Sequence, residues 1–418
     1  TLSLHDALPI CNALFHLTDP RGASDKSGRT FNNPYQYFFE QMHMDDAIYA
    51  DESIYEYPMQ QGGGNDGRPY SFGRPSSGGS KAAYPCKSYG QGRINPAYFY
   101  GVFDPNDMRR DVSITMTGSN GKGVEKLIPF VPNSKAEGGG LTLNKWDENR
   151  QANPWVAAQR KSGINGPYMR MSEVYLGYAE VCAALGDVVT GKQYLKTVRE
   201  RSFPQGLANT DAFIASFGND LVRAIIEERG FEYAGEGDRR WTLIRSGYLP
   251  EDIKRIKDMT KAMMDGLATK GYYEFENGNI ISAYIWTKLV DAKTIYGHRL
   301  TAQCPTDKVN DPVLYPGWRG QKDNWEEMGL NYGSSTPATN LAIKGLFEIV
   351  SEEEAASLES QGYTKVNWGI DLVDNRDEYD KYLFWDYDYV SAPIYLWPFT
   401  PNVMAAGGFT NGYGFKQE

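Results

Sequence analysis

The most regular hydrophobic pattern in the chain lies between residues 170 and 247. Apolar side chains recur from Met171 to Leu185 with the spacing of one face of an α-helix, and Gly186 suits a left-handed helix end. The pattern predicts further helices over about 190–201, over about 219–234 and from Asp238 to about Arg245. Paired helices of this kind are typical of tetratricopeptide-like units, which stack to bury their apolar faces. We therefore predict a mainly α protein, a tetratricopeptide-like α–α superhelix with long irregular loops and minor β structure.

The charged residues of this stretch have two interpretations. They could form an acid/base site, or they could form a solvated helix face with a few Arg–carboxylate pairs that hold one helix pair against the next. The structural interpretation is favoured because the guanidinium fork pairs well with carboxylates. The residues concerned are Glu227, Glu228, Arg229, Glu232, Glu236, Arg239, Arg240 and Arg245.

Several short motifs follow one another along the chain. They are Arg170-x-x-Glu-Val-Tyr-Leu-x-Tyr-Ala-Glu180, Val198-Arg-x-Arg201, Glu228-Arg-x-x-Glu232, Glu236-Gly-x-Arg239, Leu243-Ile-Arg245-x-Gly247, Tyr395-Leu-Trp-Pro-Phe399 and Asn411-Gly-Tyr413. In this order they resemble the SusD/RagB-like family of outer-membrane nutrient-uptake lipoproteins. The resemblance implies structural roles for Arg170, Glu173, Tyr178, Glu180, Arg199, Arg201, Glu228, Arg229, Glu232, Glu236, Arg239 and Arg245.

The rest of the chain is less regular. Apolar residues between Tyr35 and Met42 have helical spacing, and residues 60–100 are rich in Gly, Ser and Pro and predict loops. Alternating residues predict a strand over 112–117 and a second over 127–131.

Beyond the four helices, a fifth is predicted over 250–271, followed by a hairpin at Asn277-Gly278. Residues 298–332 form a long polar insert. Residues 340–350 are predicted to be helical, and Ser351 with Glu354 forms a capping box for another short helix.

Composition excludes several classes of function. The 418 residues carry a formal net charge of −10, which argues against nucleic-acid binding. The four cysteines show no CxxC spacing and no His pair stands at i, i+4, so we expect no metal and no cofactor. The acidic, aromatic segment 374–388 could bind calcium, but it lacks a recognised ligand spacing. We expect it instead to fold back along the helices.

The ends and the domain organisation follow from the same analysis. There is no apolar run of about 18 residues that would span a membrane and no basic region typical of a signal peptide. Residues 1–10 are expected to be a non-native artefact, and the chain is expected to be truncated at its N-terminus. One compact domain is predicted, with the following parts: 11–160, a loop-rich region with glycan-binding loops; and 161–418, the family-like region, divided into a helical core 168–271, a variable insert 272–375 and a closing segment 376–418.

The resemblance implies a non-catalytic protein that captures glycans and hands them to a SusC-like TonB-dependent transporter. It would lie at the outer-membrane cell surface, held by a lipid anchor that this chain lacks. Sugars have apolar ring faces and polar edges, which suit Trp and Tyr side chains placed on loops. We expect glycans to bind aromatic residues in the predicted loops. The candidates are Tyr70, Tyr98, Tyr100, Trp146, Trp155, Trp318 and Trp325.

Two other functions stay open at this point. A tetratricopeptide-type interaction scaffold, or a protein that captures peptide cargo, would use a groove and bind no sugar. A glycoside hydrolase would need two facing carboxylates roughly 5–10 Å apart. The acidic segment near Asp386 and Asp388 is the candidate, and nothing in the sequence marks these residues as a pair.

Overall fold

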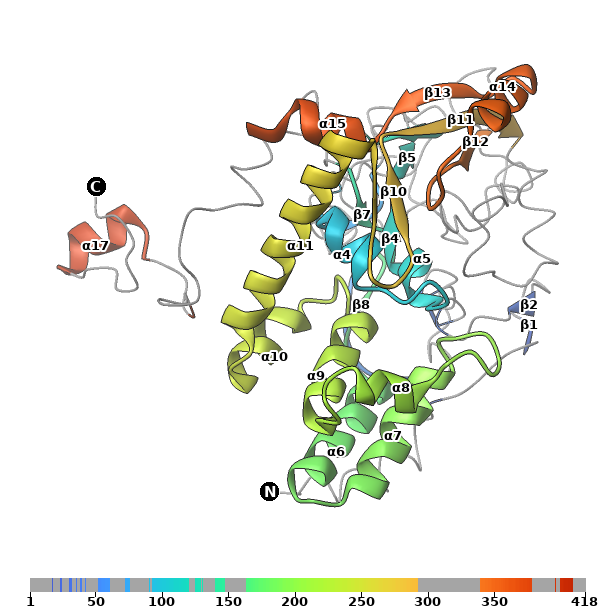
Figure 1. Ribbon diagram of the computed structural model, residues 1–418. Helices are drawn as coiled ribbons and strands as arrows, with labels where there is room; N and C mark the ends of the chain where they lie inside the picture. The colour runs from blue at the N-terminus through green and yellow to red at the C-terminus, as the bar shows by residue number, and fades with distance from the viewer. Residues whose placement is uncertain are drawn as a thin grey trace.

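The computed structural model describes somewhat more than half of the chain, including one long continuous stretch. The described residues are 17, 23–24, 30–31, 35, 38–39, 42, 52–60, 72–75, 90, 92–119, 125–128, 130, 140–146, 163–291, 339–377, 395 and 399–408. Helices make up most of the regular structure, as predicted (Figure 1). None of the described helices combines the length and apolar character of a membrane span.

The described helices are α4 (Pro96–Gly101), α5 (Arg109–Ser113), α6 (Met171–Ala184), α7 (Val188–Glu200), α8 (Thr210–Ala215), α9 (Leu221–Glu232), α10 (Asp238–Ser246), α11 (Leu249–Lys270), α14 (Glu352–Ser360), α15 (Gly369–Asp374) and α17 (Pro401–Gly407). The described strands are β1 (Ala23–Ser24), β2 (Thr30–Phe31), β3 (Ser53–Tyr57), β4 (Ile114–Thr115), β5 (Thr117–Ser119), β6 (Glu125–Leu127), β7 (Thr142–Leu143), β8 (Gly166–Arg170), β9 (Tyr272–Glu274), β10 (Ile280–Ser282), β11 (Tyr284–Asp291), β12 (Thr339–Lys344) and β13 (Thr364–Asn367).

The helical pattern of the sequence is confirmed over α6, α7, α9, α10 and α11, with ends that differ by a few residues. Capping side chains set two of the starts: Asp187 accepts a hydrogen bond from the Thr190 amide, and Asp220 accepts one from the Arg223 amide. Gly271 takes the left-handed conformation that ends α11. The short helix α8 was not predicted.

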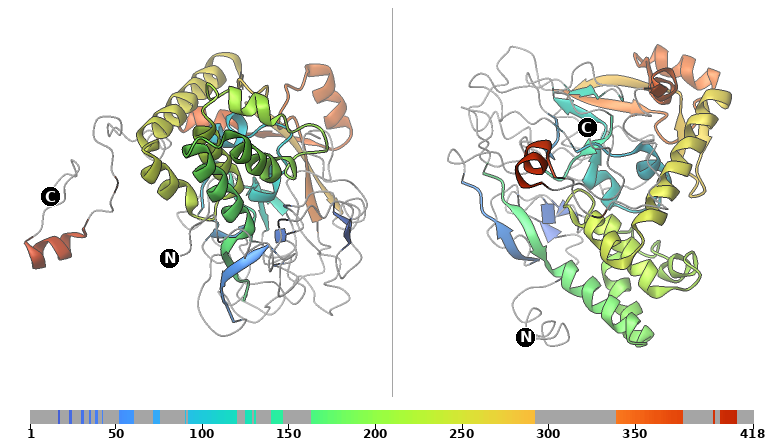
Figure 2. Two further views of the ribbon diagram at one scale, coloured as in Figure 1. Left: turned by 90° about the horizontal axis from the view of Figure 1, so that it is seen from below. Right: turned by 90° about the vertical axis from the view of Figure 1, so that its left-hand side faces the viewer.

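Helices α6, α7 and α9 pack together at one end of the molecule (Figure 1). Their shared core contains Leu176, Leu195, Val198 and Ile225, all fully buried. Figure 2 shows this group from below, with the β3–β8 strand pair running alongside it.

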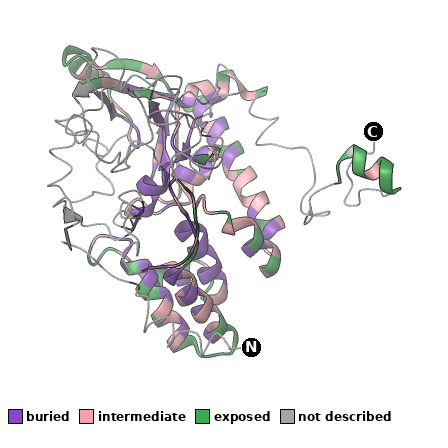
Figure 3. Ribbon diagram, turned by 180° about the vertical axis from the view of Figure 1, so that it is seen from behind, coloured by how far each residue is buried: buried purple, intermediate pink, exposed green. Residues whose placement is uncertain are grey.

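The largest core lies between α4, α11 and the strands β9 to β12 (Figure 3). The predicted hairpin at Asn277-Gly278 is confirmed, since β9 and β10 pair across it. The side chain of Asn277 donates to the carbonyl oxygens of Tyr100 and Phe103, so the turn is bound to the end of α4.

The predicted helix over residues 340–350 is wrong. Residues 339–344 form strand β12, which pairs with β11, and β13 pairs with the other edge of β11. Leu341 and Ile343 alternate toward the core, and a short apolar run of this kind does not distinguish a helix from a strand. The partner strand β11 decides the outcome, and it lies about 50 residues earlier in the chain.

Two strand predictions are shifted. Residues 109–113 are helical, so the predicted strand over 112–117 is divided between α5, β4 and β5. The predicted strand over 127–131 is replaced by β6, which ends at Leu127. The capping box of Ser351 and Glu354 is confirmed at the start of α14.

The insert 298–332 and most of the acidic segment 374–388 lie outside the described residues. The insert leaves and returns at one end of the sheet, because Asp291 and Thr339 are paired residues of β11 and β12.

Gly191 lies where α7 crosses α6, and we predict that its replacement by Ala destabilises the protein. A Cβ atom there would approach the backbone oxygen of Ala179 to 2.9 Å, which neither helix can relieve cheaply. Overpacking costs about 1–3 kcal/mol and exceeds the gain of roughly 1 kcal/mol from removing a helical glycine. Urea unfolding measures the difference. Gln193→Ala, exposed on the same helix, is the control, and a stabilised Gly191→Ala variant would contradict the packing described.

Candidate functional site

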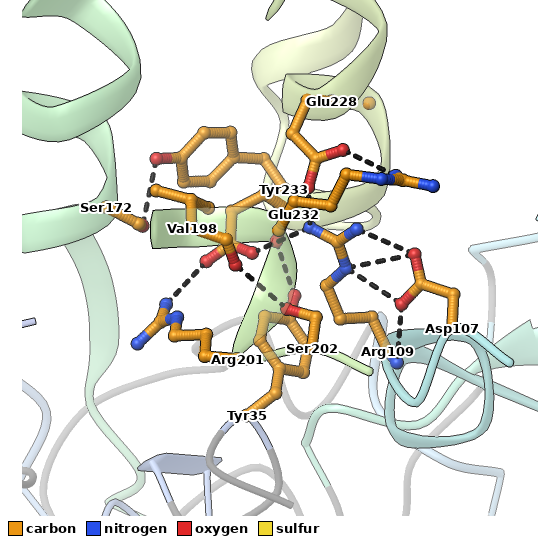
Figure 4. A network of polar contacts seen from close by, with 12 residues as sticks. Tyr35, Asp107, Arg109, Ser172, Val198, Arg201, Ser202, Glu228, Glu232 and Tyr233 are labelled. Carbon is orange, nitrogen blue, oxygen red and sulfur yellow. Dashed lines mark hydrogen bonds and ion pairs between the residues drawn. The ribbon is translucent and has the colours of Figure 1, made fainter. Parts of the chain in front are cut away.

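Ten buried charged residues meet where the helical group joins the rest of the protein. We call them the buried network: Glu52, Asp107, Arg109, Lys145, Arg170, Arg199, Arg201, Glu228, Glu232 and Glu236. Five are cationic and five anionic, so the formal charges cancel. Figure 4 shows Glu228 and Glu232 of α9 facing Arg109 and Arg201.

Arg170 uses its whole guanidinium group. It lies at the end of β8 and occupies the N-cap position of α6, without a capping hydrogen bond from its side chain. One terminal nitrogen donates to Glu232 at 2.5 Å and to Glu52 at 2.9 Å, and the other donates to the carbonyl oxygen of Glu232 at 2.7 Å. The Nε and Nη2 atoms both bind the carboxylate of Glu236. One side chain therefore ties α6, α9 and the start of β3 together.

Two further arginines share the carboxylate of Glu232. Arg201, which follows α7, donates to it at 2.9 Å and forms two bonds with Glu52. Arg109, from α5, lies 3.0 Å from Glu232, 2.7 Å from Glu228 and 2.6 Å from Asp107. Glu228 and Glu232 point the same way because residues four apart lie on one face of a helix.

Lys145 brings in two more distant segments. Its ammonium group lies 2.6 Å from Glu236 and 5.0 Å from the ring centroids of both Tyr35 and Phe39. The Tyr35 hydroxyl donates to the carbonyl oxygen of Glu232. Tyr35 and Phe39, together with residues 141–146, are thereby held at the end of α9.

The electrostatics of the buried network match this geometry. Burial alone would raise the pKa of Glu232, but Arg170, Arg201 and Arg109 outweigh it and hold that pKa well below its usual value. Burial lowers the pKa of Lys145 to about 8, against the opposing effect of Glu236. Glu232 therefore stays ionised and cannot donate a proton near neutral pH. The network binds segments together and shows no pair of carboxylates free for chemistry.

The expected structural residues outside the network also form pairs. Arg229 binds Asp238 at 2.5 Å and Glu173 at 3.5 Å, and Arg239 binds Glu227 at 2.8 Å. Arg245 binds Glu180 at the surface. The structure differs from the expected solvated face, since Glu227, Glu228 and Glu232 are buried. Sequence periodicity alone did not show that α9 is covered on nearly all sides.

Sequence reasoning missed Glu52, Asp107, Arg109 and Lys145. Asp107 and Arg109 lie in the segment Phe103-Asp-Pro-Asn-Asp-Met-Arg-Arg-Asp111, whose clustered charges were a usable signal. Glu52 and Lys145 are isolated in the sequence. Only the fold brings Glu52 to Arg170 and Lys145 to Glu236. Across the described ranges, no group of three His, Cys, Asp or Glu side chains is placed to hold a metal.

Three of the expected glycan-binding aromatic residues lie in helices or in the core. Tyr98 and Tyr100 belong to α4, not to a loop. The Tyr98 hydroxyl donates to the carbonyl oxygen of Gly230, and the Tyr100 hydroxyl accepts from the indole of Trp368. Tyr100 and Trp146 are fully buried. Tyr70, Trp155, Trp318 and Trp325 lie outside the described residues.

The β3–β8 strand pair instead presents aromatic side chains to solvent. Tyr55, Tyr57 and Tyr168 are 58%, 63% and 67% exposed, and we call them the tyrosine surface. The rings of Tyr55 and Tyr168 meet edge to face, with centroids 5.6 Å apart. Beside these tyrosines, the side-chain amide of Asn165 donates a hydrogen bond to the carboxylate of Glu56. The alternation Tyr55-Glu-Tyr57 is the signal that would have found two of these residues.

Comparison with known proteins decides the family. The model described as the SusD family matches residues 15–398. The chain belongs to the SusD family. SusD-like protein P25 of Formosa agariphila is 28% identical to it over 160 residues, which cover 38% of this chain and 26% of that protein.

Solved structures of the SusD family are also similar to the chain. A SusD homolog from Bacteroides thetaiotaomicron is 18% identical, with a TM-score of 0.42, over 61% of this chain and 50% of that one. Surface glycan-binding protein A from the same species, in complex with laminarihexaose, is 17% identical, with a TM-score of 0.36, over 59% of this chain and 51% of that one. The chain thus spans about half the length of these structures and about a quarter of P25.

Replacing Arg201 is predicted to lower the free energy of unfolding far more than replacing a surface arginine does. Arg201→Met leaves two buried carboxylates with fewer partners, and breaking a buried ion pair costs about 3–5 kcal/mol. Arg245→Met breaks an ion pair whose arginine is 48% exposed, and it should cost less than about 1 kcal/mol. Chemical denaturation of both variants makes the comparison. Equal losses would show that the network does not bear on stability.

Acid should weaken the fold through Glu232 and Glu236, whose pKa values are lowered in the folded state. The unfolded chain takes up these protons near its ordinary pKa of 4.5, and the folded protein does not. Their stabilising contribution is therefore present above about pH 4.5 and is lost as the pH falls through the folded-state pKa values.

Urea unfolding between pH 6 and pH 3 measures this dependence. Glu232→Gln should flatten the dependence of the unfolding free energy on pH. Glu352→Gln, on an exposed helix turn, should leave it unchanged. An unaltered slope in Glu232→Gln would rule out the proposed cause.

Proposed function

We propose that this protein captures glycans at the cell surface and passes them to a SusC-like TonB-dependent outer-membrane transporter. The observation that carries the proposal is the match of the SusD family model to residues 15–398. The motif resemblance in the sequence implies the same role, with a lipid anchor holding the protein at the outer membrane. The protein binds its glycan and does not cleave it.

The tyrosine surface supports this proposal. A tyrosine ring offers an apolar face to the CH groups of a sugar, and its hydroxyl offers a hydrogen bond at the edge. Tyr55 and Tyr57 are both exposed and flank the half-buried Glu56 on β3, whose pairing with β8 is irregular between Tyr55 and Glu56. The strand pair is anchored at one end by Arg170 and Glu52, which keeps the platform rigid.

Other aromatic residues extend the set of candidates. Tyr70, Trp155, Trp318 and Trp325 remain proposed glycan contacts. Tyr98, Tyr100 and Trp146 pack in or against the core and are not proposed as direct glycan contacts.

A thermal-shift screen against soluble oligosaccharides and polysaccharides identifies the ligand. A glycan at about 100 times its dissociation constant should add roughly 2.7 kcal/mol of stability. No stabilisation by any glycan, or the appearance of new reducing ends during incubation, would contradict the proposed function.

The tyrosine surface is then tested with the best ligand of that screen. Tyr55→Ala and Tyr168→Ala should each weaken binding about tenfold, which corresponds to a loss of about 1.4 kcal/mol. Trp241→Ala removes an equally exposed aromatic residue on α10 and should leave the affinity unchanged. If only the tryptophan variant loses affinity, the glycan binds elsewhere.

A further inference from the structure

The outer face of the three-stranded sheet carries a cluster of lysine and aromatic side chains. Its inner face carries Ile285 and Ile343, which are fully buried, while Leu289 further along β11 is half exposed. On the outer face Trp286 of β11 is paired with Lys344 of β12 on one side and with Lys365 of β13 on the other. Tyr284 and Lys288 lie two residues away along β11 and share this face. We call these five residues the lysine face.

Two of the lysines are held in defined positions. The ammonium group of Lys365 lies 4.1 Å from the ring centroid of Tyr284 and 5.9 Å from that of Trp286. The ammonium group of Lys288 donates to the carbonyl oxygen of Gln361 at 2.7 Å and lies 5.8 Å from the ring of Tyr363. Cation–π contacts of this kind hold a flexible side chain near its binding position, which lowers the entropy lost when a ligand binds.

The described carboxylates do not neutralise Lys288 and Lys365. Within the described part of the chain, no carboxylate forms an ion pair with Lys288 or Lys365. The chain as a whole carries a net charge of −10, so a local group of lysines is a departure from the overall charge. Uncompensated positive charge that is held in place is the complement of a bound anion.

Trp286 is not part of the accessible surface of this face. It is only 6% exposed, and its buried indole Nε1 has no hydrogen-bond partner among the described residues. A bound anion would therefore contact the two lysines and Tyr284, and not the indole.

We propose that the lysine face binds an acidic glycan, whose sulfate or carboxylate groups pair with Lys365 and Lys288 while a sugar ring lies against Tyr284. The proposal rests on the glycan capture proposed above and narrows the ligand to an anionic class. Tyr284 is partly exposed, and its ring is adjacent to the lysine, so one sugar could contact both.

Charged and uncharged polysaccharides test whether binding requires negative charge on the ligand. Dextran sulfate and dextran share one backbone and differ in charge. Binding of the full chain to dextran sulfate, to uncharged dextran and to polygalacturonic acid is measured by affinity electrophoresis at low and at high salt. Dextran sulfate and polygalacturonic acid separate sulfate from carboxylate recognition. Vesicles containing phosphatidylserine test an anionic lipid surface as the other source of negative charge.

The variant Lys288→Gln/Lys365→Gln removes the two positioned lysines. Its control, Lys261→Gln/Lys270→Gln, removes the same charge from exposed sites on α11. We expect the wild type to bind at least one anionic probe more tightly than dextran, and less tightly as salt rises. The first variant should lose affinity about tenfold or more, and the control should lose little. Melting curves of both variants confirm that they fold.

Several results would overturn the inference. They are equal binding of charged and uncharged probes, equal loss in the two double variants, or binding to the vesicles alone. If neutral glycans bind through the tyrosine surface while the anionic probes do not, the glycan-capture function stands and the acidic-glycan inference fails. If no glycan binds at all, both fail.

Discussion

A single buried carboxylate, that of Glu232, constrains much of this structure. A charge removed from water must be neutralised by close partners, and three arginines from different parts of the chain serve Glu232. Each of those arginines needs further acceptors, which brings in Glu52, Asp107, Glu228 and Glu236. The outcome is a balanced network that fixes the segments around residues 35, 52, 108, 145, 170, 200 and 232 to one another. Replacing one member of the network would leave the charge of its partner buried without a counter-ion.

The network also determines where the proposed binding surfaces lie. Arg170 ends β8 two residues after Tyr168, and Glu52 precedes β3 three residues before Tyr55. The tyrosine surface is therefore attached to the most constrained point of the fold, which favours a preformed platform. The lysine face is positioned differently, by the apolar inner side of its sheet, where Ile285, Leu341 and Ile343 are buried.

The sequence was sufficient for elements whose signals are local. The spacing of apolar residues in α6 and the capping box at Ser351 were both predicted without the fold. The strand β12 was not, because its identity depends on pairing with β11 across the insert. The same reason applies to the network: Glu228 and Glu232 stand in a motif, but Glu52 and Lys145 carry no local signal. Aromatic residues were assigned to loops by composition, and composition does not show that Tyr100 and Trp146 are buried while Tyr55 and Tyr168 are exposed.

The central claim is that the buried charges act as one coupled unit, and a double-mutant cycle on Arg170 and Glu232 tests it most directly. The variants Arg170→Met, Glu232→Leu and the combination of both would be compared by urea unfolding. If the two side chains depend on each other, the double variant is more stable than the sum of the single losses predicts, by at least about 1 kcal/mol. Losses that add to within roughly 0.3–0.5 kcal/mol would mean that the two residues act independently, and would contradict this account of the fold.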